Sequence, residues 1–242
     1  IDIMDTLKLL TKLTQINSVS GNEKEIKEYI KSETEKYCSE IYTDAMGNLV
    51  ARKQGDGKKI MFAAHMDEIG IIVTDIDDKG FVLFAAVGGL NTRNLVNLRV
   101  CFSNGTEGVI GAREDAFKDK PALSKLYIDI GADSRESALA LVSIGDTAAF
   151  KGECIQSGDK VISKALDNRA GCAVLIEALS RIEKNDNDLY FVFTVQEEVG
   201  LRGAKTAAFA IEPDVAVAVD VTDTGDTPDA PIMAVKMGKG AA

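Results

Sequence analysis

The sequence predicts an α/β protein, with a mostly parallel sheet flanked by helices and a small all-β domain inserted into it. Three observations lead to this fold class. Both ends of the chain alternate stretches of helical periodicity with short apolar runs, which is typical of a sheet covered by helices on both faces. The middle of the chain instead carries short strands separated by turn residues. A length of 242 residues with 45% apolar content suffices for one large domain or two modest ones.

The N-terminal region is expected to form two helices. Apolar residues recur at helical spacing from residue 3 to 13 and again from 26 to 37. Between these stretches, Ser20 or Asn22 is suited to cap the second helix, because a short polar side chain can accept a hydrogen bond from a free N–H group of the first turn. Glu23 would then lie in that first turn, where the helix dipole favours an acid.

A hairpin and a strand follow these helices. The stretches 41–44 and 48–53 are separated by a Met-Gly pair that indicates a turn. Residues 59–64 form an apolar run that is expected to be a strand, and it leads directly into His65, the only histidine of the chain.

The pattern changes between residues 69 and 162, where an all-β domain is expected. The Asn-Gly pair at 104–105 is a strong hairpin signal. Six short strands are predicted in this block, at residues 69–75, 80–87, 98–102, 108–112, 126–130 and 147–151.

Beyond residue 163 the α/β pattern resumes. Helices are expected at 169–182 and 202–209, and strands at 189–196 and 215–221. Because both strands are continuously apolar, we expect them in the centre of the sheet with both faces covered. The predicted organisation is therefore one α/β domain in two parts, residues 1–68 and 163–242, with an inserted domain at residues 69–162 between them.

Charge and hydropathy narrow the possible partners. The net charge is −10, and the chain lacks the clustered Lys and Arg that a phosphate-binding surface needs, so neither nucleic acid nor an anionic membrane is expected as a partner. The apolar runs are much shorter than the ~20 residues of a membrane span, and no signal-peptide pattern is present at the N-terminus. We therefore expect a cytoplasmic protein.

Polar side chains that can bind metal follow several of the apolar runs. These are His65 after the third strand, Asp167 at the helix after the insertion, Glu197 and Glu198 after the next strand, and Asp220 at the last one. Because ligands of open α/β sheets bind at the carboxyl ends of the strands, residues far apart in sequence can converge there. Together they predict the ligand set of a two-metal hydrolase.

Each of these residues also has a plainer explanation. His65 could be a hydrogen-bonded histidine at a strand end, and the two adjacent glutamates could be an exposed pair. Asp167 could pair with Arg169, and Asp220 could be a structural acid with a buried partner. Asp67 favours the metal site, because an imidazole that binds a metal through one nitrogen usually donates its other N–H to a carboxylate.

The pair of Glu197 and Glu198 suits metal-assisted hydrolysis. Two adjacent acids in a cleft repel each other unless one binds a cation and the other can hold a proton. One can then be a ligand, while the other is a general base that takes a proton from a water and passes it to the leaving group. The acid-rich set without thiolates suits zinc, cobalt or manganese, with zinc or cobalt favoured. Asp167 is our choice for an acid that bridges two ions.

Seven motifs resemble, in order, those of the dinuclear-metal aminopeptidases. This family includes the glutamyl aminopeptidases and the tetrahedral deblocking aminopeptidases, and some of its members carry the label endoglucanase. The motifs span nearly the whole chain and lie at residues 18–23, 64–70, 87–89, 127–131, 165–171, 195–204 and 219–222.

The resemblance implies a zinc-peptidase-like fold and a role for each candidate residue. It implies that one ion is held by His65 and Asp220, that Asp167 bridges, that Glu198 holds the second ion, that Glu197 is the general base and that Asp67 orients His65. It also implies a cis peptide bond between Asp167 and Asn168. The inserted β domain is expected to mediate contacts in a homo-oligomer, often a dodecamer in this family.

One departure from the family concerns the end of the chain. The family carries a further histidine ligand well after the segment that corresponds to residues 238–240, and here the sequence stops at Ala242. We therefore expect the second of the two divalent ions to be incompletely coordinated by this chain, which would bind metal poorly or at one site, whereas the complete protein is active. Two tightly held zinc ions per chain would refute this expectation.

Three functions remain open on the sequence. The first is an aminopeptidase that acts on peptide substrates. The second is a glycoside hydrolase that pairs Glu197 with Asp220 or Asp67, although the chain has no Trp and only 6% aromatic residues to stack on sugar rings. The third is a metal-binding or assembly module without catalysis.

Overall fold

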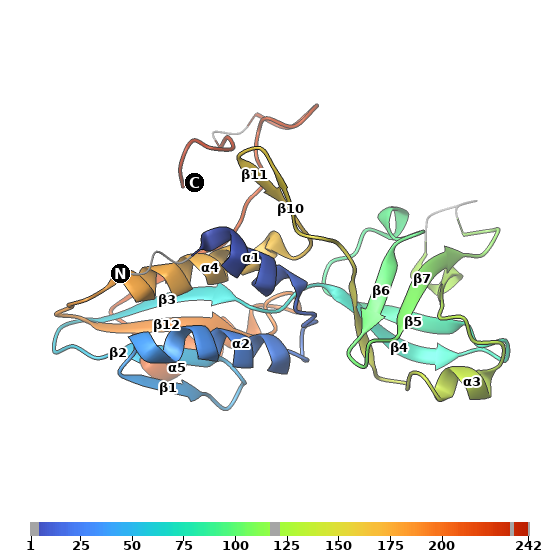
Figure 1. Ribbon diagram of the computed structural model, residues 1–242, viewed down its shortest axis with the longest axis horizontal. Coiled ribbons are helices and arrows are strands. Elements are labelled where there is room, and N and C mark those ends of the chain that lie inside the picture. The colour runs from blue at the N-terminus through green and yellow to red at the C-terminus, as the bar shows by residue number, and fades with distance from the viewer. Residues whose placement is uncertain (1–4, 117–121, 233–234, 242) are drawn as a thin grey trace.

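The computed structural model describes residues 5–116, 122–232 and 235–241, and these form two lobes (Figure 1). One lobe contains a five-stranded sheet with helices, and the other contains a closed six-stranded barrel. All six barrel strands fall between two consecutive elements of the first lobe in the sequence. The chain is therefore a mixed α/β protein with more than one sheet.

The five-stranded sheet is mixed, whereas the sequence predicts a mostly parallel one. Its two parallel pairings join β3 (Lys59–His65) to its two neighbours, and the other two pairings are antiparallel. The difference arises because the N-terminal hairpin, which reverses at Gly47, supplies two of the five strands. In spatial order the strands are β1 (Glu40–Thr43), β2 (Leu49–Lys53), β12 (Asp188–Thr194), β3 (Lys59–His65) and β13 (Val215–Ala218).

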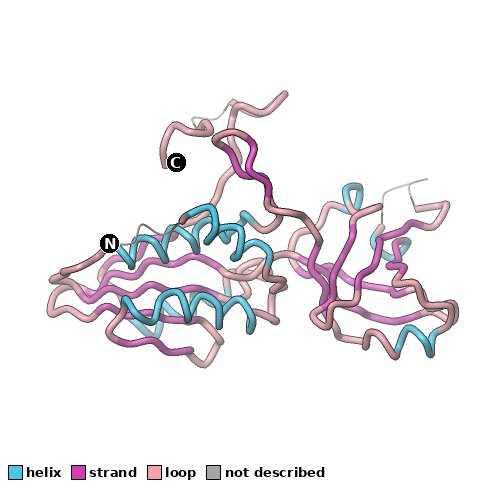
Figure 2. The backbone as a smooth tube through the Cα atoms, in the orientation of Figure 1, coloured by secondary structure: helices cyan, strands magenta, loops and turns pink. Residues whose placement is uncertain are grey.

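Helices cover both faces of this sheet, as Figure 2 shows. On one face, α1 (Thr6–Gln15), α2 (Lys24–Thr34) and α4 (Leu166–Arg181) pack against alternate side chains of β2, β3 and β12. On the other face, α5 (Arg202–Ile211) packs against the remaining side chains of the same strands. Because β12 lies between these layers, every one of its residues is buried.

The central strand position predicted for β13 is wrong for the described residues. Its four residues are exposed, and it pairs with β3 at the edge of the sheet. The apolar composition of a strand reports its tendency to be buried, but the elements that cover it depend on the tertiary arrangement.

The second lobe is a closed barrel with its own core. Its strands agree with the predicted ones to within about two residues, and the predicted Asn-Gly hairpin joins two of them, with Gly105 at φ 88°. A short helix, α3 (Arg135–Leu139), lies at its side. In spatial order the strands are β4 (Gly70–Ile76), β5 (Val82–Val87), β8 (Leu126–Asp129), β7 (Glu107–Ala112), β6 (Arg99–Phe102) and β9 (Thr147–Phe150).

The connection from the barrel back to α4 contains a small hairpin that the sequence analysis did not predict. It consists of β10 (Ile155–Ser157) and β11 (Lys160–Ile162) and projects from the body of the molecule (Figure 1). Single turns of 3₁₀ helix occur at Glu35–Tyr37, Thr92–Asn94 and Leu123–Lys125. Among the described helices, none combines the length and the apolar composition that crossing a bilayer requires.

Candidate metal centre

His65 is the last residue of β3, and its ring is buried with one nitrogen facing a group of acids. The Nε2 atom lies 2.9 Å from Asp167 Oδ1, 3.8 Å from Glu197 Oε2 and 3.9 Å from Asp220 Oδ1. Glu197 and Asp220 reach His65 because β3, β12 and β13 are parallel and end at the same edge of the sheet, whereas Asp167 comes from the start of α4. The predicted convergence at the carboxyl ends of the strands is therefore present.

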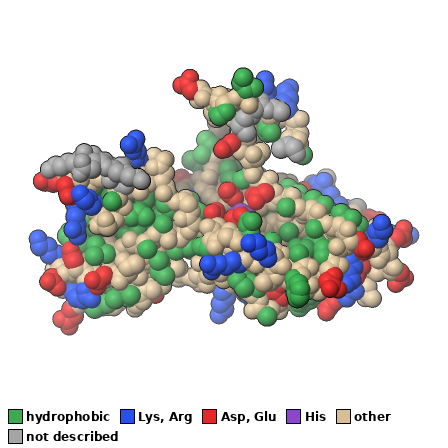
Figure 3. Space-filling view, turned by 180° about the vertical axis from the view of Figure 1, so that it is seen from behind, with side chains coloured by type: hydrophobic (Ala, Val, Ile, Leu, Met, Phe, Trp, Pro, Cys, Tyr) green, Lys and Arg blue, Asp and Glu red, His purple; other side chains and the backbone are tan. Residues whose placement is uncertain are grey.

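Two overlapping groups of potential metal ligands share His65. One consists of His65, Asp167 and Asp220, and the other of His65, Glu197 and Glu198. Within each group the ligand atoms lie within 4.8 Å of one another. Figure 3 shows acidic side chains gathered in the middle of the molecule, with the single histidine among them.

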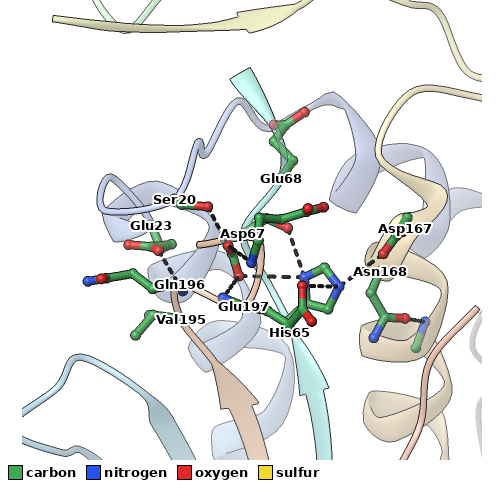
Figure 4. A network of polar contacts seen from close by, with 12 residues as sticks. Ser20, Glu23, His65, Asp67, Glu68, Asp167, Asn168, Val195, Gln196 and Glu197 are labelled. Atoms are coloured by element: carbon green, nitrogen blue, oxygen red, sulfur yellow. Dashed lines mark hydrogen bonds and ion pairs between the residues drawn. The ribbon is translucent and has the colours of Figure 1, made fainter. Parts of the chain in front are cut away.

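Asp67 contacts both His65 and the loop that carries the two glutamates. The Nδ1 atom of His65 lies 3.2 Å from the backbone oxygen of Asp67 and 3.5 Å from its Oδ1. The carboxylate of Asp67, which is fully buried, also accepts hydrogen bonds from the backbone N–H groups of Glu197 at 3.0 Å and Glu198 at 3.2 Å, and from the Ser20 hydroxyl at 2.5 Å (Figure 4). Asp67 therefore links the histidine to the acidic loop.

This site contains more carboxylates than its single imidazole can neutralise. Burial alone would lower the pKa of His65, but its contacts with Asp167 and Asp67 outweigh burial and raise it from an ordinary value near 6.5 to about 10. Burial raises the pKa of Glu198 to about 7, and the nearby charge of Asp167 adds to this shift. Burial also raises the pKa of Glu197, with further contributions from Asp67 and Asp220.

Burial acts in the opposite sense to hydrogen bonding at Asp67. Removal from water would raise the pKa of this carboxyl, yet the hydrogen bonds from His65, Ser20 and the Glu197 N–H group outweigh it and lower the pKa. Asp67 therefore stays ionised and keeps accepting these bonds.

The donor set fits a divalent cation. The donors are one imidazole nitrogen and four carboxylates, and neither a sulfur ligand nor a neutralising lysine is among them. Such a set suits a borderline cation such as zinc or cobalt. A cation would also offset the burial and the nearby acid charges that raise the pKa values of the two glutamates. The Cys172 sulfur contacts the backbone oxygen of His65, and burial raises the pKa of its thiol to about 12, so it remains a neutral thiol beside the site.

Asp167 reaches the site from an irregular start of α4. Its backbone is non-helical, and the peptide bond between Asp167 and Asn168 is cis, as the sequence analysis predicts. The Asn168 side chain holds this segment by donating to the Val219 carbonyl at 2.8 Å and accepting from the Gly171 N–H group at 3.0 Å.

The alternative explanation that Asp167 pairs with Arg169 does not hold. Arg169 is completely buried, and its guanidinium donates to the carbonyl oxygens of Leu13 and Ile16 instead. It also lies 3.5 Å from the Glu68 carboxylate. Asp167 therefore remains available to His65 and to a cation.

Sequence reasoning missed a buried charged cluster next to the site. Glu68 directly follows Asp67, and Lys164 Nζ lies 2.8 and 2.9 Å from its two carboxylate oxygens. The Ser18 N–H group donates to the same carboxylate at 2.9 Å. Glu68 stands inside the motif at residues 64–70, and Lys164 stands just before the motif at residues 165–171. These positions in the sequence were a signal of a role at the site, although no local pattern paired the two residues.

The predicted cap of α2 is also wrong. Glu23 occupies the N-cap position, and its side chain makes no capping hydrogen bond. Ser20 donates to Asp67 instead, and the Asn22 side-chain amide donates to Ser103 and Thr147 of the barrel lobe. Tertiary partners thus take the polar groups that the local pattern assigned to the helix.

Comparison with known proteins gives consistent matches. The model of the M42 glutamyl aminopeptidase family matches residues 47–242. A putative aminopeptidase of Acetivibrio thermocellus is 58% identical over 239 residues, which cover 98% of this chain and 72% of that protein.

Solved structures show the same fold. An aminopeptidase from the archaeon Desulfurococcus kamchatkensis has a TM-score of 0.88 and 40% identity, over 93% of this chain and 65% of that one. The TET1 peptidase of Pyrococcus horikoshii, described as assembling into a tetrahedron or a large octahedral shell, has a TM-score of 0.84 and 38% identity, over 93% of this chain and 72% of that one. The chain thus spans roughly two thirds of the length of the relatives that it matches.

Proposed function

Because this chain belongs to the M42 glutamyl aminopeptidase family, we propose that it carries the catalytic site of a metal-dependent aminopeptidase that removes N-terminal residues from peptides. The observation that supports this proposal most strongly is the contact of His65 Nε2 with carboxylates from three segments distant in sequence. A shared donor set of this kind suits metal-assisted hydrolysis.

The residues present would hold one divalent ion and supply part of the ligands of a second, with zinc or cobalt favoured. His65 and Asp220 would hold one ion, Glu198 the other, and Asp167 would contact both. When bound, such ions polarise a peptide carbonyl and make a water a better nucleophile at neutral pH. The surplus of carboxylates also favours a positively charged N-terminal amine in the substrate, because opposite charges attract in a partly buried cleft.

Glu197 is proposed as the general base. Burial and the neighbouring acids Asp67 and Asp220 raise its pKa, so its carboxylate can accept a proton from the attacking water and return it to the leaving amine. Asp67 would fix the tautomer and direction of His65 through its contact with Nδ1.

Replacement of Glu197 by Gln tests the proposal. The variant keeps the shape of the side chain but cannot accept the proton, so kcat on short peptides should fall by roughly 10²- to 10⁴-fold, while metal content measured by elemental analysis stays the same. The activity of the complete wild-type protein should also disappear with a chelator and return with zinc or cobalt.

Two substrate controls separate the alternatives. A peptide with an acetylated N-terminus should resist the enzyme, because the free amine is part of recognition. A cellulose-like polymer should not be cleaved, and chelator-resistant cleavage of such a polymer would favour the glycoside hydrolase instead. A Glu197→Gln variant with full peptidase activity would refute the assignment of the base.

We also propose that residues 69–162 form an inserted oligomerisation domain between the two parts of a catalytic domain, residues 1–68 and 163–242. The similarity to the Pyrococcus horikoshii peptidase that forms closed shells supports self-assembly. A homo-oligomer such as a dodecamer would then enclose the active sites.

A further inference from the structure

We propose that Glu23 is a positioning residue that holds Glu197 in place through the backbone of the loop after β12. This inference rests on the proposed function, in which Glu197 is the general base. Glu23 belongs to the motif at residues 18–23, and the proposed chemistry gives Glu23 itself no other role.

The loop after β12 is held by side chains from distant segments. Four consecutive backbone N–H groups, from residue 195 to 198, each donate to a side-chain oxygen more than 100 positions away in the sequence. The acceptors are Asn48 Oδ1 at 3.0 Å, Glu23 Oε1 at 3.1 Å, and the two carboxylate oxygens of Asp67 at 3.0 and 3.2 Å. Figure 4 shows Glu23 and Asp67 beside this loop.

The loop needs these partners because it has left the regular structure of the sheet. Gln196 has a left-handed backbone with φ 54°, and Leu201 follows with φ 57°. A backbone N–H group that is shielded from water and is not in a sheet ladder needs another acceptor. The side-chain acceptors therefore decide where the loop runs.

The burial and the hydrogen bonds of Glu23 suit this contact. It is buried, and the single oxygen Oε1 accepts from both the Gly21 N–H group at 2.8 Å and the Gln196 N–H group at 3.1 Å. It thereby ties the turn before α2 to the residue immediately before Glu197. Although it stands at the N-cap position of α2, its side chain does not cap that helix.

The consequence for catalysis follows from geometry. A general base must lie within hydrogen-bond reach of the proton that it takes, and a misplacement of about 1 Å can cost roughly 100-fold in rate. Loss of the Glu23 acceptor leaves the Gln196 N–H group without this hydrogen bond, and Glu197 is the next residue. The contacts of Asp67 remain, so the loop is displaced or loosened rather than lost.

Kinetics of three variants test this role. Glu23→Ala should lower kcat by about 10- to 100-fold and leave KM and metal content within about twofold. Glu23→Gln should stay close to wild type, because its amide oxygen can still accept both hydrogen bonds. Glu25→Ala, which removes an exposed acid from the first turn of the same helix, is the matched control and should be unchanged.

Hydrogen–deuterium exchange gives a readout that needs no activity. In the peptide that covers residues 195–201, amide exchange should be faster in Glu23→Ala than in wild type, Glu23→Gln or Glu25→Ala. If the complete wild-type protein shows no aminopeptidase activity, the proposed function fails while this measurement still reports the contact.

Three results would overturn the inference. These are a kcat within twofold of wild type in Glu23→Ala, an equal loss in Glu23→Gln, or unchanged exchange in the 195–201 peptide. If Glu23→Ala does not fold, Glu23→Asp takes its place, since it keeps the charge but draws the acceptor back by one methylene. The same loss of kcat is expected there, and full activity would refute the role.

Discussion

At the residue scale, the two ring nitrogens of His65 have different surroundings. Nδ1 lies 3.2 Å from the Asp67 backbone oxygen, and Nε2 lies 2.9 Å from Asp167 Oδ1. The Nε2 side faces the other acids and is the side on which a cation would compete with a proton. Asp67 fixes the ring from the opposite side.

We expect zinc binding to the chelator-stripped protein to release protons. The pKa of His65 is about 10 and that of Glu198 about 7, so at neutral pH the ring and a share of the glutamate carry protons that a cation must displace. Affinity should therefore rise with pH, by about tenfold per pH unit for each proton displaced. Titration calorimetry in two buffers of different ionisation enthalpy measures this release, and heats independent of the buffer would contradict it.

Also at the residue scale, Glu68, Lys164 and Arg169 show how charges support the site from inside. The two cations contact one buried carboxylate that directly follows Asp67. Burial lowers the pKa of Lys164, while the charge of Glu68 opposes this shift. Such a cluster ties the segment after β3 to the start of α4, and so fixes His65 relative to Asp167.

At the element scale, the sheet is joined by a polar contact at the end opposite the site. Arg52 on β2 lies opposite Tyr190 on β12, and its guanidinium donates to the Asp188 carboxylate at 2.9 and 2.8 Å. The Tyr190 hydroxyl donates to the same carboxylate at 2.9 Å. This contact locks the register of the two antiparallel strands.

The Arg52 contact should make stability depend on pH. Hydrogen bonds from Arg52 lower the pKa of Asp188, despite burial. A carboxyl with a lower pKa in the folded chain adds stability that is complete above its unfolded value, near 3.9, and is lost as the pH falls through the folded value. The difference in unfolding free energy between wild type and Asp188→Asn should therefore shrink as the pH drops below about 4.

Urea unfolding at a series of pH values measures this difference. Asp78→Asn, at an exposed turn of the barrel, controls for the loss of one negative charge. A difference between wild type and Asp188→Asn that stays constant from about pH 6 to 3 would show that Asp188 has the same pKa in both states.

Two elements show where local patterns stop being informative. The apolar runs of β12 and β13 look alike in sequence, yet β12 is buried throughout and β13 is exposed at the edge of the described sheet. Likewise, Ser20 and Asn22 both suit a helix cap, yet each bonds to another segment. Periodicity gives the type of element, whereas burial and hydrogen-bond partners depend on neighbours from elsewhere in the chain.

At the scale of the whole molecule, the two lobes have separate cores. The barrel lobe exposes large apolar side chains on and after α3, namely Leu139, Leu141 and Ile144, which are 44%, 42% and 55% exposed. Exposed apolar groups that lie close together often mark protein contacts. They are consistent with the proposed oligomerisation role of this lobe.

Charged substitutions at this surface should weaken assembly. In the double variant Leu141→Glu and Ile144→Glu, two charges would have to be buried in any contact, so the dissociation constant should rise at least about tenfold. Light scattering over a dilution series measures the mass. Phe209→Glu, at an 86% exposed position on α5 of the other lobe, is the control and should assemble as wild type. Equal weakening by both variants would argue against the barrel as the site of contact.

The sequence by itself determined the chemistry that is available. Apolar runs predicted nearly all the described strands, and the polar residues that follow these runs gave the candidate ligands, His65 and its acids, which the structure brings together. The strands could be predicted because strand ends and turn residues are local features. The candidate ligands stood out because one histidine among several strand-end acids is a distinctive combination. The family resemblance added the cis bond at Asp167 and Asn168, which is present.

Only the tertiary structure decided how these residues are held. The contacts of Glu23, Asn48 and Asp67 with the loop after β12 join segments more than 100 residues apart, and the closure of the barrel joins β4 to β9. The physical reason is that a hydrogen bond depends on distance in space, which local periodicity does not encode. The sequence therefore indicated the candidate groups, and the fold set their positions.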